Sequence, residues 1–128
     1  MLRYKRHHFT AHGVSSPKIG EEFMAHAIAE SEHADRLAQR IVQLGGEPDF
    51  SPDTLTCRSH AEYVAGASLS DMIRENLVAE RIAMDSYREL IQYLDKADPT
   101  TGKLIKEILA VEEQHADELA DFLVDVPA

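Results

Sequence analysis

The segment Ala29–Arg36, AESEHADR, shares Glu, His, Ala and Asp at matching positions with the later segment Val111–Glu118, VEEQHADE. In both copies a glutamate stands three residues before a histidine; the pairs are Glu30 with His33 and Glu112 with His115. Residues three apart lie on one face of an α-helix, so the two side chains of each pair project in the same direction. The repeat therefore predicts two helices that present the same chemistry.

Residues that start and stop helices divide the chain around this repeat. Ser16-Pro17 predicts a helix start, Gly45-Gly46 predicts its end, and Ser68 with Asp71 resembles a capping box. The expected elements are a short helix over 1–13, long helices over 16–45, 68–97 and 98–125, and a crossover over 46–67 with a helical turn around Ala61–Val64.

Apolar residues recur at steps of four and three along each long helix, which predicts that the helices pack as a bundle. The middle of every apolar stripe carries a glutamate. The predicted stripes are Phe23, Ala27, Glu30, Ala34, Leu37, Ile41 and Leu44; then Leu69, Ile73, Leu77, Glu80, Met84, Tyr87, Ile91 and Leu94; then Ile105, Ile108, Glu112, His115, Leu119 and Phe122. Packing of these stripes is expected to bring five polar side chains together: Glu30, His33, Glu80, Glu112 and His115.

Carboxylates at these positions need positive partners. Burying an unpaired carboxylate costs several kcal/mol, against a total stability of about 5 to 15 kcal/mol for a domain. The nearby cations Arg36, Arg40 and Arg81 fall on other helix faces. A single Glu-x-x-His motif is more often a surface salt-bridge former, but two copies in register with a third glutamate favour bound metal. Oxygen and imidazole ligands without sulfur suit iron, manganese or zinc, and the charge balance favours two divalent ions.

Composition limits the remaining possibilities. The chain has 128 residues, 44% of them hydrophobic, and no Trp, which favours a single helical domain. The formal net charge of -10 disfavours nucleic-acid binding. Cys57 is the only cysteine, which excludes an internal disulfide and indicates a reducing compartment. Because no apolar run is long enough to span a membrane, we expect a cytoplasmic protein.

The five polar residues resemble the ligand set of the ferritin-like di-iron carboxylate proteins, most closely the bacterioferritin and Dps-like branch. That pattern takes one Glu from each of two helices and Glu-x-x-His from each of the other two. The resemblance implies an all-α antiparallel four-helix bundle with a long crossover connection, formed by residues 1–128 as one domain. It also implies that Glu30 and Glu112 bridge two metal ions, with His33 on one ion and Glu80 and His115 on the other.

Two positions depart from the family pattern. Tyr4 resembles a first-helix tyrosine that follows a metal-binding Glu by about one heptad, and the matching Glu would precede residue 1. The first helix is therefore expected to be truncated, with one metal position a carboxylate short. Ser31 stands where haem-binding bacterioferritins carry Met, so no haem is expected.

The resemblance implies a ferroxidase that oxidises Fe(II) with O2 or H2O2 for iron storage or detoxification. The expected assembly is a homo-oligomer that does not contact a membrane. Two alternatives stay open at this stage. One is a di-metal peroxidase similar to manganese catalases, and the other is a non-catalytic bundle subunit that has lost one metal position.

Further residues have two readings each. His26 precedes Glu30 by one turn, so it either lines a metal route or holds an auxiliary ion, or it makes a partly exposed polar contact. His7, His8 and His12 are typical of a helix end, and less typical of a basic tail that touches DNA. Tyr4 and Tyr87 either hydrogen-bond the carboxylates or shuttle electrons, or they fill the core as aromatic residues at this spacing most often do.

Overall fold

A computed structural model describes residues 1–13 and 15–127 of the chain. Its helices are α1 (Leu2–Thr10), α2 (Ser16–Gln43), the 3-10 turn η1 (Pro52–Thr54), α3 (Leu55–Arg58), α4 (Leu69–Ala97) and α5 (Pro99–Asp125). The described residues contain no strand, and none of their helices is long and apolar enough to cross a membrane. The predicted all-α class is confirmed.

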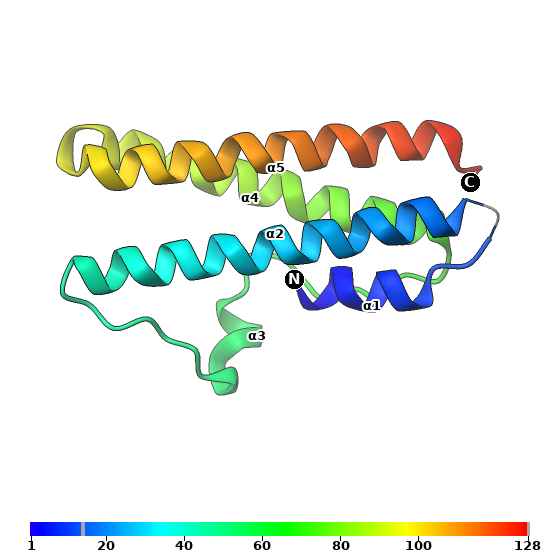
Figure 1. Cartoon of the computed structure of the whole chain (residues 1–128), viewed down its shortest axis with the longest axis horizontal. Helices are drawn as coiled ribbons and strands as arrows, with labels where there is room; N and C mark the ends of the chain where they lie inside the picture. Colours follow the sequence, from blue (N-terminus) through cyan, green and yellow to red (C-terminus); the bar gives the residue numbers. More distant parts are fainter. Residues whose placement is uncertain (14, 128) are drawn as a thin grey trace.

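Two antiparallel helix pairs make up the bundle (Figure 1). The pair α1 and α2 packs beside the pair α4 and α5, and the segment after α2 returns along the bundle before α4 begins. Because of this return, α4 runs in the same direction as α2. The long crossover predicted from the Pro-containing segment is therefore present.

Local side-chain chemistry fixes the ends of the long helices. Ser68 and Asp71 form the predicted capping box at the start of α4, each side chain accepting from the other residue's backbone N–H. The Asp98 side chain accepts from the Thr101 backbone N–H at 3.1 Å and so caps α5. Gly45, just after α2, has a φ of 85°, a conformation that favours glycine.

The predicted stripes of α4 and α5 face the interior. Ile73, Ile105, Ile108 and Leu119 are fully buried there, as is Phe23 of α2. The stripe predicted for the second half of α2 is wrong at Ala34, Ile41 and Leu44, which are exposed in this chain, whereas Leu37 is half-buried. The physical reason is the nine-residue length of α1, which covers only the part of α2 nearer its start (Figure 1).

The helical turn predicted at Ala61–Val64 is also displaced. Helical backbone occurs earlier, in η1 and α3, where Ser51 accepts from the Asp53 N–H and Pro52 begins the turn. Residues 61–65 have no helical hydrogen bonds of their own and run past α1 as an irregular segment. The Arg3 guanidinium donates to the Glu62 carbonyl at 2.7 Å, so a contact from α1 replaces the expected turn.

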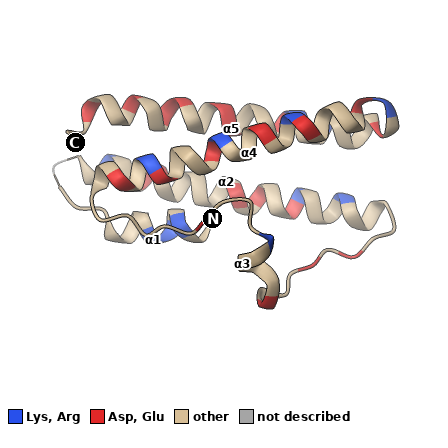
Figure 2. Ribbon diagram, turned by 180° about the vertical axis from the view of Figure 1, so that it is seen from behind, with Lys and Arg blue, Asp and Glu red and all other residues tan. Residues whose placement is uncertain are grey.

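A buried polar network joins α1, the crossover and α4. The His7 ring is fully buried; its Nδ1 accepts from the Asn76 amide at 2.8 Å and its Nε2 donates to the Ala65 carbonyl at 2.6 Å. The Arg3 Nε–H donates to Asn76 Oδ1, the side-chain amide oxygen, at 3.1 Å. The Lys and Arg residues of α1 stand out in Figure 2, but Arg3 and His7 are occupied by these contacts. Neither is free to act as part of a DNA-binding tail.

Candidate metal centre

The five side chains predicted from the repeat converge in the middle of the bundle. Helix α2 supplies Glu30 and His33, α4 supplies Glu80, and α5 supplies Glu112 and His115. Ligand atoms of all these residues except His33 lie within 4.8 Å of one another. His33 Nδ1 lies 3.0 Å from Glu112 Oε1 and 3.9 Å from Glu30 Oε2, so the fifth residue joins the same cluster.

Most of the cluster is removed from water. Glu80 and Glu112 are 3% and 1% exposed, and both histidines are buried. Glu30 differs, because 23% of its side chain is exposed. The centre therefore has a closed side formed by α4 and α5 and a more open side at Glu30.

Several buried polar atoms of the centre have no hydrogen-bond partner. They are both carboxylate oxygens of Glu112 and the Nδ1 atoms of His33 and His115. Although His33 Nδ1 and Glu112 Oε1 are close, they are not aligned for a hydrogen bond. Within the described chain, no Lys or Arg side chain and no terminal amine lies within 4.0 Å of the three glutamates. Such unpartnered buried groups are costly without a cation, and their oxygen and nitrogen donors fit a divalent metal ion.

Burial and mutual repulsion alter the protonation of the carboxyl groups. Burial, followed by the neighbouring carboxylates Glu80 and Glu30, raises the pKa of Glu112 strongly. Burial and Glu80 also raise the pKa of Glu30, against the opposing amino group of Met1. Burial acts to raise the pKa of Glu80 as well, but His115, Glu112 and Tyr4 outweigh it and lower that pKa. The raised pKa favours a protonated Glu112 in the absence of metal, and a bound cation would displace that proton.

Both predicted tyrosines lie near the centre, with different contacts. The buried Tyr4 hydroxyl donates to Glu80 Oε1, so Tyr4 orients the α4 carboxylate. Burial and the charge of Glu80 raise the pKa of Tyr4 well above its ordinary value, which keeps the hydroxyl protonated as a donor. Tyr87 is half-buried, and burial together with Glu112 raises its pKa.

His26 is more buried than the sequence analysis predicted. It is 2% exposed, its ring stacks on the His115 ring with centroids 3.9 Å apart, and its Nε2 lies 2.8 Å from Glu118 Oε2. The reading of His26 as a partly exposed contact is wrong. Sequence reasoning missed Glu118, although its place three residues after His115 puts it on the same face of α5.

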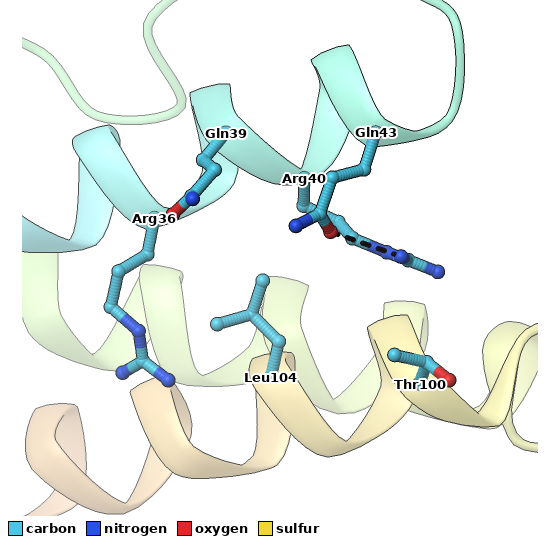
Figure 3. A pocket seen from close by; sticks show the side chains of 6 residues that line it. All are labelled: Arg36, Gln39, Arg40, Gln43, Thr100 and Leu104. Atoms are coloured by element: carbon cyan, nitrogen blue, oxygen red, sulfur yellow. Dashed lines mark hydrogen bonds between the residues drawn. The ribbon is translucent and has the colours of Figure 1, made fainter.

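A surface hollow of about 180 Å³ lies away from this centre, between the C-terminal part of α2 and the start of α5 (Figure 3). Its lining residues are Arg36, Gln39, Arg40, Gln43, Thr100 and Leu104. Arg36 is paired with Glu107, and Arg40 with Asp98, so the two guanidinium groups already have carboxylate partners. The hollow shares no residue with the centre.

The sequence matches the family model described as "Ferritin-like domain" over residues 1–128, and the chain belongs to that family. A bacterioferritin from Desulfovibrio desulfuricans is 23% identical over 114 residues, covering 88% of this chain and 60% of the relative. A DNA protection during starvation protein from Pyrococcus furiosus is 29% identical, covering 96% of this chain and 67% of the relative. The chain thus spans about 60% of the length of the bacterioferritins it matches.

Solved structures show the same fold. The bacterioferritin-related protein of Bacteroides fragilis, described as a dodecameric thioferritin, superposes with a TM-score of 0.91 at 30% identity, over 97% of this chain and 75% of that one. A Dps protein from Thermosynechococcus elongatus superposes with a TM-score of 0.88 at 18% identity, over 95% and 79%. The predicted ferritin-like bundle of the bacterioferritin and Dps-like branch is confirmed.

Proposed function

We propose that this chain is a ferroxidase that oxidises Fe(II) at a paired metal site for iron storage or detoxification. The site consists of Glu30, His33, Glu80, Glu112 and His115. The observation that carries the proposal is the set of buried, unpartnered atoms of Glu112, His33 and His115, which lie close to the carboxylates of Glu30 and Glu80. Membership of the ferritin-like family and the bacterioferritin relatives support the same assignment.

The geometry supports a division of these residues between two ions. Glu112 lies between the two histidines, with its oxygens 3.0 Å from His33 Nδ1 and 3.8 Å from His115 Nδ1. This central place suits Glu112 to a bridging role, with Glu30 as the second bridge. His33 then serves one ion, and Glu80 with His115 serves the other, since Glu80 Oε1 is 3.5 Å from His115 Nδ1.

Iron is the substrate in this proposal. Two adjacent ferrous ions supply two electrons to one O2 or H2O2 molecule, which a single ferrous ion cannot do. Burial lowers the pKa of His33, so its imidazole stays neutral and keeps a nitrogen lone pair for the metal at neutral pH. The Tyr4 hydroxyl holds Glu80 in place as a negatively charged ligand.

We also propose that the chain works as a homo-oligomer. The Bacteroides fragilis relative is described as dodecameric, and the present chain exposes apolar side chains that an assembly would cover. Among them are Ile41, Leu44 and Phe50, which are 41%, 60% and 70% exposed. Exposed apolar groups of this size are typical of interaction surfaces when they lie together.

Stopped-flow oxidation of Fe(II) tests the proposed activity. We expect Glu80→Ala to lose rapid oxidation, because it removes a carboxylate that the second ion needs. Glu89→Ala is the matched control, since Glu89 is an exposed glutamate on the same helix. Equal rates for wild type, Glu80→Ala and Glu89→Ala would contradict the ferroxidase assignment.

A further inference from the structure

A second cluster of metal-ligating groups lies beside the centre, where α2 and α5 face each other. Glu22 and His26 project from α2 one turn apart, and Glu118 projects from α5. Each of these residues offers a ligand atom, and the three atoms lie within 4.8 Å of one another. None of the three residues belongs to the ferroxidase set proposed above.

His26 is the fixed member of this cluster. Its ring is 2% exposed, its Nε2 lies 2.8 Å from Glu118 Oε2, and its buried Nδ1 has no partner. Glu22 and Glu118 are only partly buried. The cluster therefore has a rigid imidazole at its inner end and two carboxylates that an ion in solution can reach.

The two carboxylates lack a fixed cation. In the described part of the chain, no Lys or Arg nitrogen lies within 4.0 Å of Glu22 or Glu118. Glu118 is held by His26 and by the Gln114 amide at 2.9 Å. Lys18 is one turn before Glu22, but its amine lies over the Phe122 ring, 5.7 Å from the centroid. A divalent ion would supply the missing positive charge.

Ring geometry separates this cluster from the ferroxidase centre. The His26 and His115 rings are stacked, with an angle of 20° between their planes. A metal ion bound by imidazole lies in the ring plane, about 2.0 to 2.1 Å from the nitrogen. A ligand atom of His26 also lies within 4.8 Å of ligand atoms of Glu80 and His115. Two nearly parallel rings cannot both direct their lone pairs at one ion, so the stacking of His26 on His115 disfavours a single ion bound by both rings.

We propose that Glu22, His26 and Glu118 form a third divalent-cation site, next to the ferroxidase centre. Two carboxylate oxygens and one imidazole nitrogen suit Fe(II), Mn(II) or Zn(II), with water in the remaining positions. On binding, the ion takes the Nε2 lone pair of the neutral His26 tautomer that carries its hydrogen on Nδ1, so two ligand bonds replace the contact between His26 Nε2 and Glu118 Oε2 and no proton is released.

Zn(II) binding under equilibrium dialysis, with metal analysis, tests the site without any redox step. We expect the double variant Glu22→Gln with Glu118→Gln to bind about one ion per chain fewer than wild type. The matched control is Glu21→Gln with Asp121→Asn, which removes two exposed carboxylates from the same helices. This control is expected to bind as wild type, and circular dichroism checks that both variants fold.

The proposal of a third site does not depend on the proposed oxidation activity, and each proposal is contradicted by a different result. Glu112→Gln is expected to lose ions from the centre and to keep the ion at Glu22, His26 and Glu118. Two results would overturn the third site. One is equal Zn(II) content in wild type and in the Glu22/Glu118 double variant. The other is a His26→Ala variant that binds one Zn(II) ion fewer than wild type while the Glu22/Glu118 double variant binds as many as wild type. His26 would then be a ligand of the ferroxidase centre and not of a third site.

Discussion

Glu112 shows at the scale of one residue why the centre favours metal. Its carboxyl group is 1% exposed, and neither oxygen has a hydrogen-bond partner. Burial and the nearby Glu80 and Glu30 raise the pKa of this group, which favours its protonated form in the folded chain without metal. A neutral amide of the same size imitates that protonated state but is a poor metal ligand.

Glu112→Gln should therefore separate stability from metal binding. The free energy of unfolding without metal is expected to stay within about 1 kcal/mol of wild type or to rise, because no buried charge is lost. Zn(II) at about one hundred times its dissociation constant should stabilise wild type by about 2.7 kcal/mol and the variant much less. Denaturant unfolding with and without Zn(II) measures both quantities. Glu113→Gln, at an exposed neighbour, is the control, and equal Zn(II) stabilisation in all three proteins would contradict the assignment.

Tyr4→Phe should weaken metal binding without removing a ligand. The substitution deletes the hydroxyl that donates to Glu80, and loss of such an orienting hydrogen bond typically costs about 10- to 100-fold in metal affinity. Competition with a coloured chelator measures the Zn(II) affinity. Tyr93→Phe is the control, because Tyr93 is 76% exposed. An unchanged affinity in Tyr4→Phe would show that Tyr4 has only a packing role.

Sequence periodicity predicted which residues meet at the centre, because the spacing within one helix fixes the face on which a side chain lies. Tyr4 was identified differently, from its resemblance to a tyrosine position in the family. The partners Glu118 and Asn76 were not identified, since each meets a histidine on another helix. Contacts between helices depend on their relative rotation and height, which the spacing within one helix does not contain.

At the scale of elements, Asp98 fastens the start of α5 to the end of α2. Its carboxylate accepts from the Thr101 N–H and hydroxyl and from the Arg40 guanidinium. These contacts, first among them the Thr101 hydroxyl, lower the pKa of Asp98. A group whose pKa is lower in the folded chain stabilises folding above its unfolded pKa, and this stabilisation is lost as pH falls through the folded pKa.

Asp98→Asn should therefore change how the stability of the folded chain depends on pH in the acidic range. Wild type is expected to lose the Asp98 contribution only below the ordinary pKa range of an aspartate, whereas the variant lacks the contribution throughout. The difference in melting temperature between the two proteins should shrink as the pH falls toward acid. Thermal unfolding at a series of pH values measures it, with exposed Asp95→Asn as the control. A difference that stays constant with pH would contradict this role.

The network of Arg3, His7 and Asn76 holds α1 and the crossover on α4. Asn76→Ala leaves the buried His7 Nδ1 without its donor and removes one of the two acceptors of Arg3, which still donates to the Glu62 carbonyl, so we expect a loss of about 1 to 3 kcal/mol in stability. Hydrogen exchange should also become faster in α1 and around Ala65. Gln92→Ala, at an exposed position of the same helix, is the control. If exchange in α1 stays at the wild-type rate, the network does not hold this helix.

The stripe of α2 shows where element-level prediction fails. Ala34, Ile41 and Leu44 follow the apolar spacing but are exposed in this chain. Periodicity reports which face of a helix is apolar, and it does not report how far along that face a partner extends. In this chain α1 packs on the part of α2 nearer its start, and the apolar spacing within α2 contains no information about that.

At the scale of the whole molecule, two helix pairs place one Glu-x-x-His motif on each side of the bundle, and α4 adds Glu80 between them. The occurrence of Glu-x-x-His in both α2 and α5 follows from this arrangement. Ferritin-like family membership and the solved structures at TM-scores of 0.91 and 0.88 agree with that architecture. The fold was predictable because helix ends, apolar stripes and the crossover are all marked locally in the sequence.

Anomalous X-ray scattering from crystals loaded with Zn(II) tests the central claim most directly, because it locates ions without reference to activity. We expect about two peaks among Glu30, His33, Glu80, Glu112 and His115, at about 2.0 to 2.2 Å from their oxygen and nitrogen atoms. Absence of any peak among these five residues in fully loaded crystals would contradict the proposal that their buried carboxylates exist to hold metal.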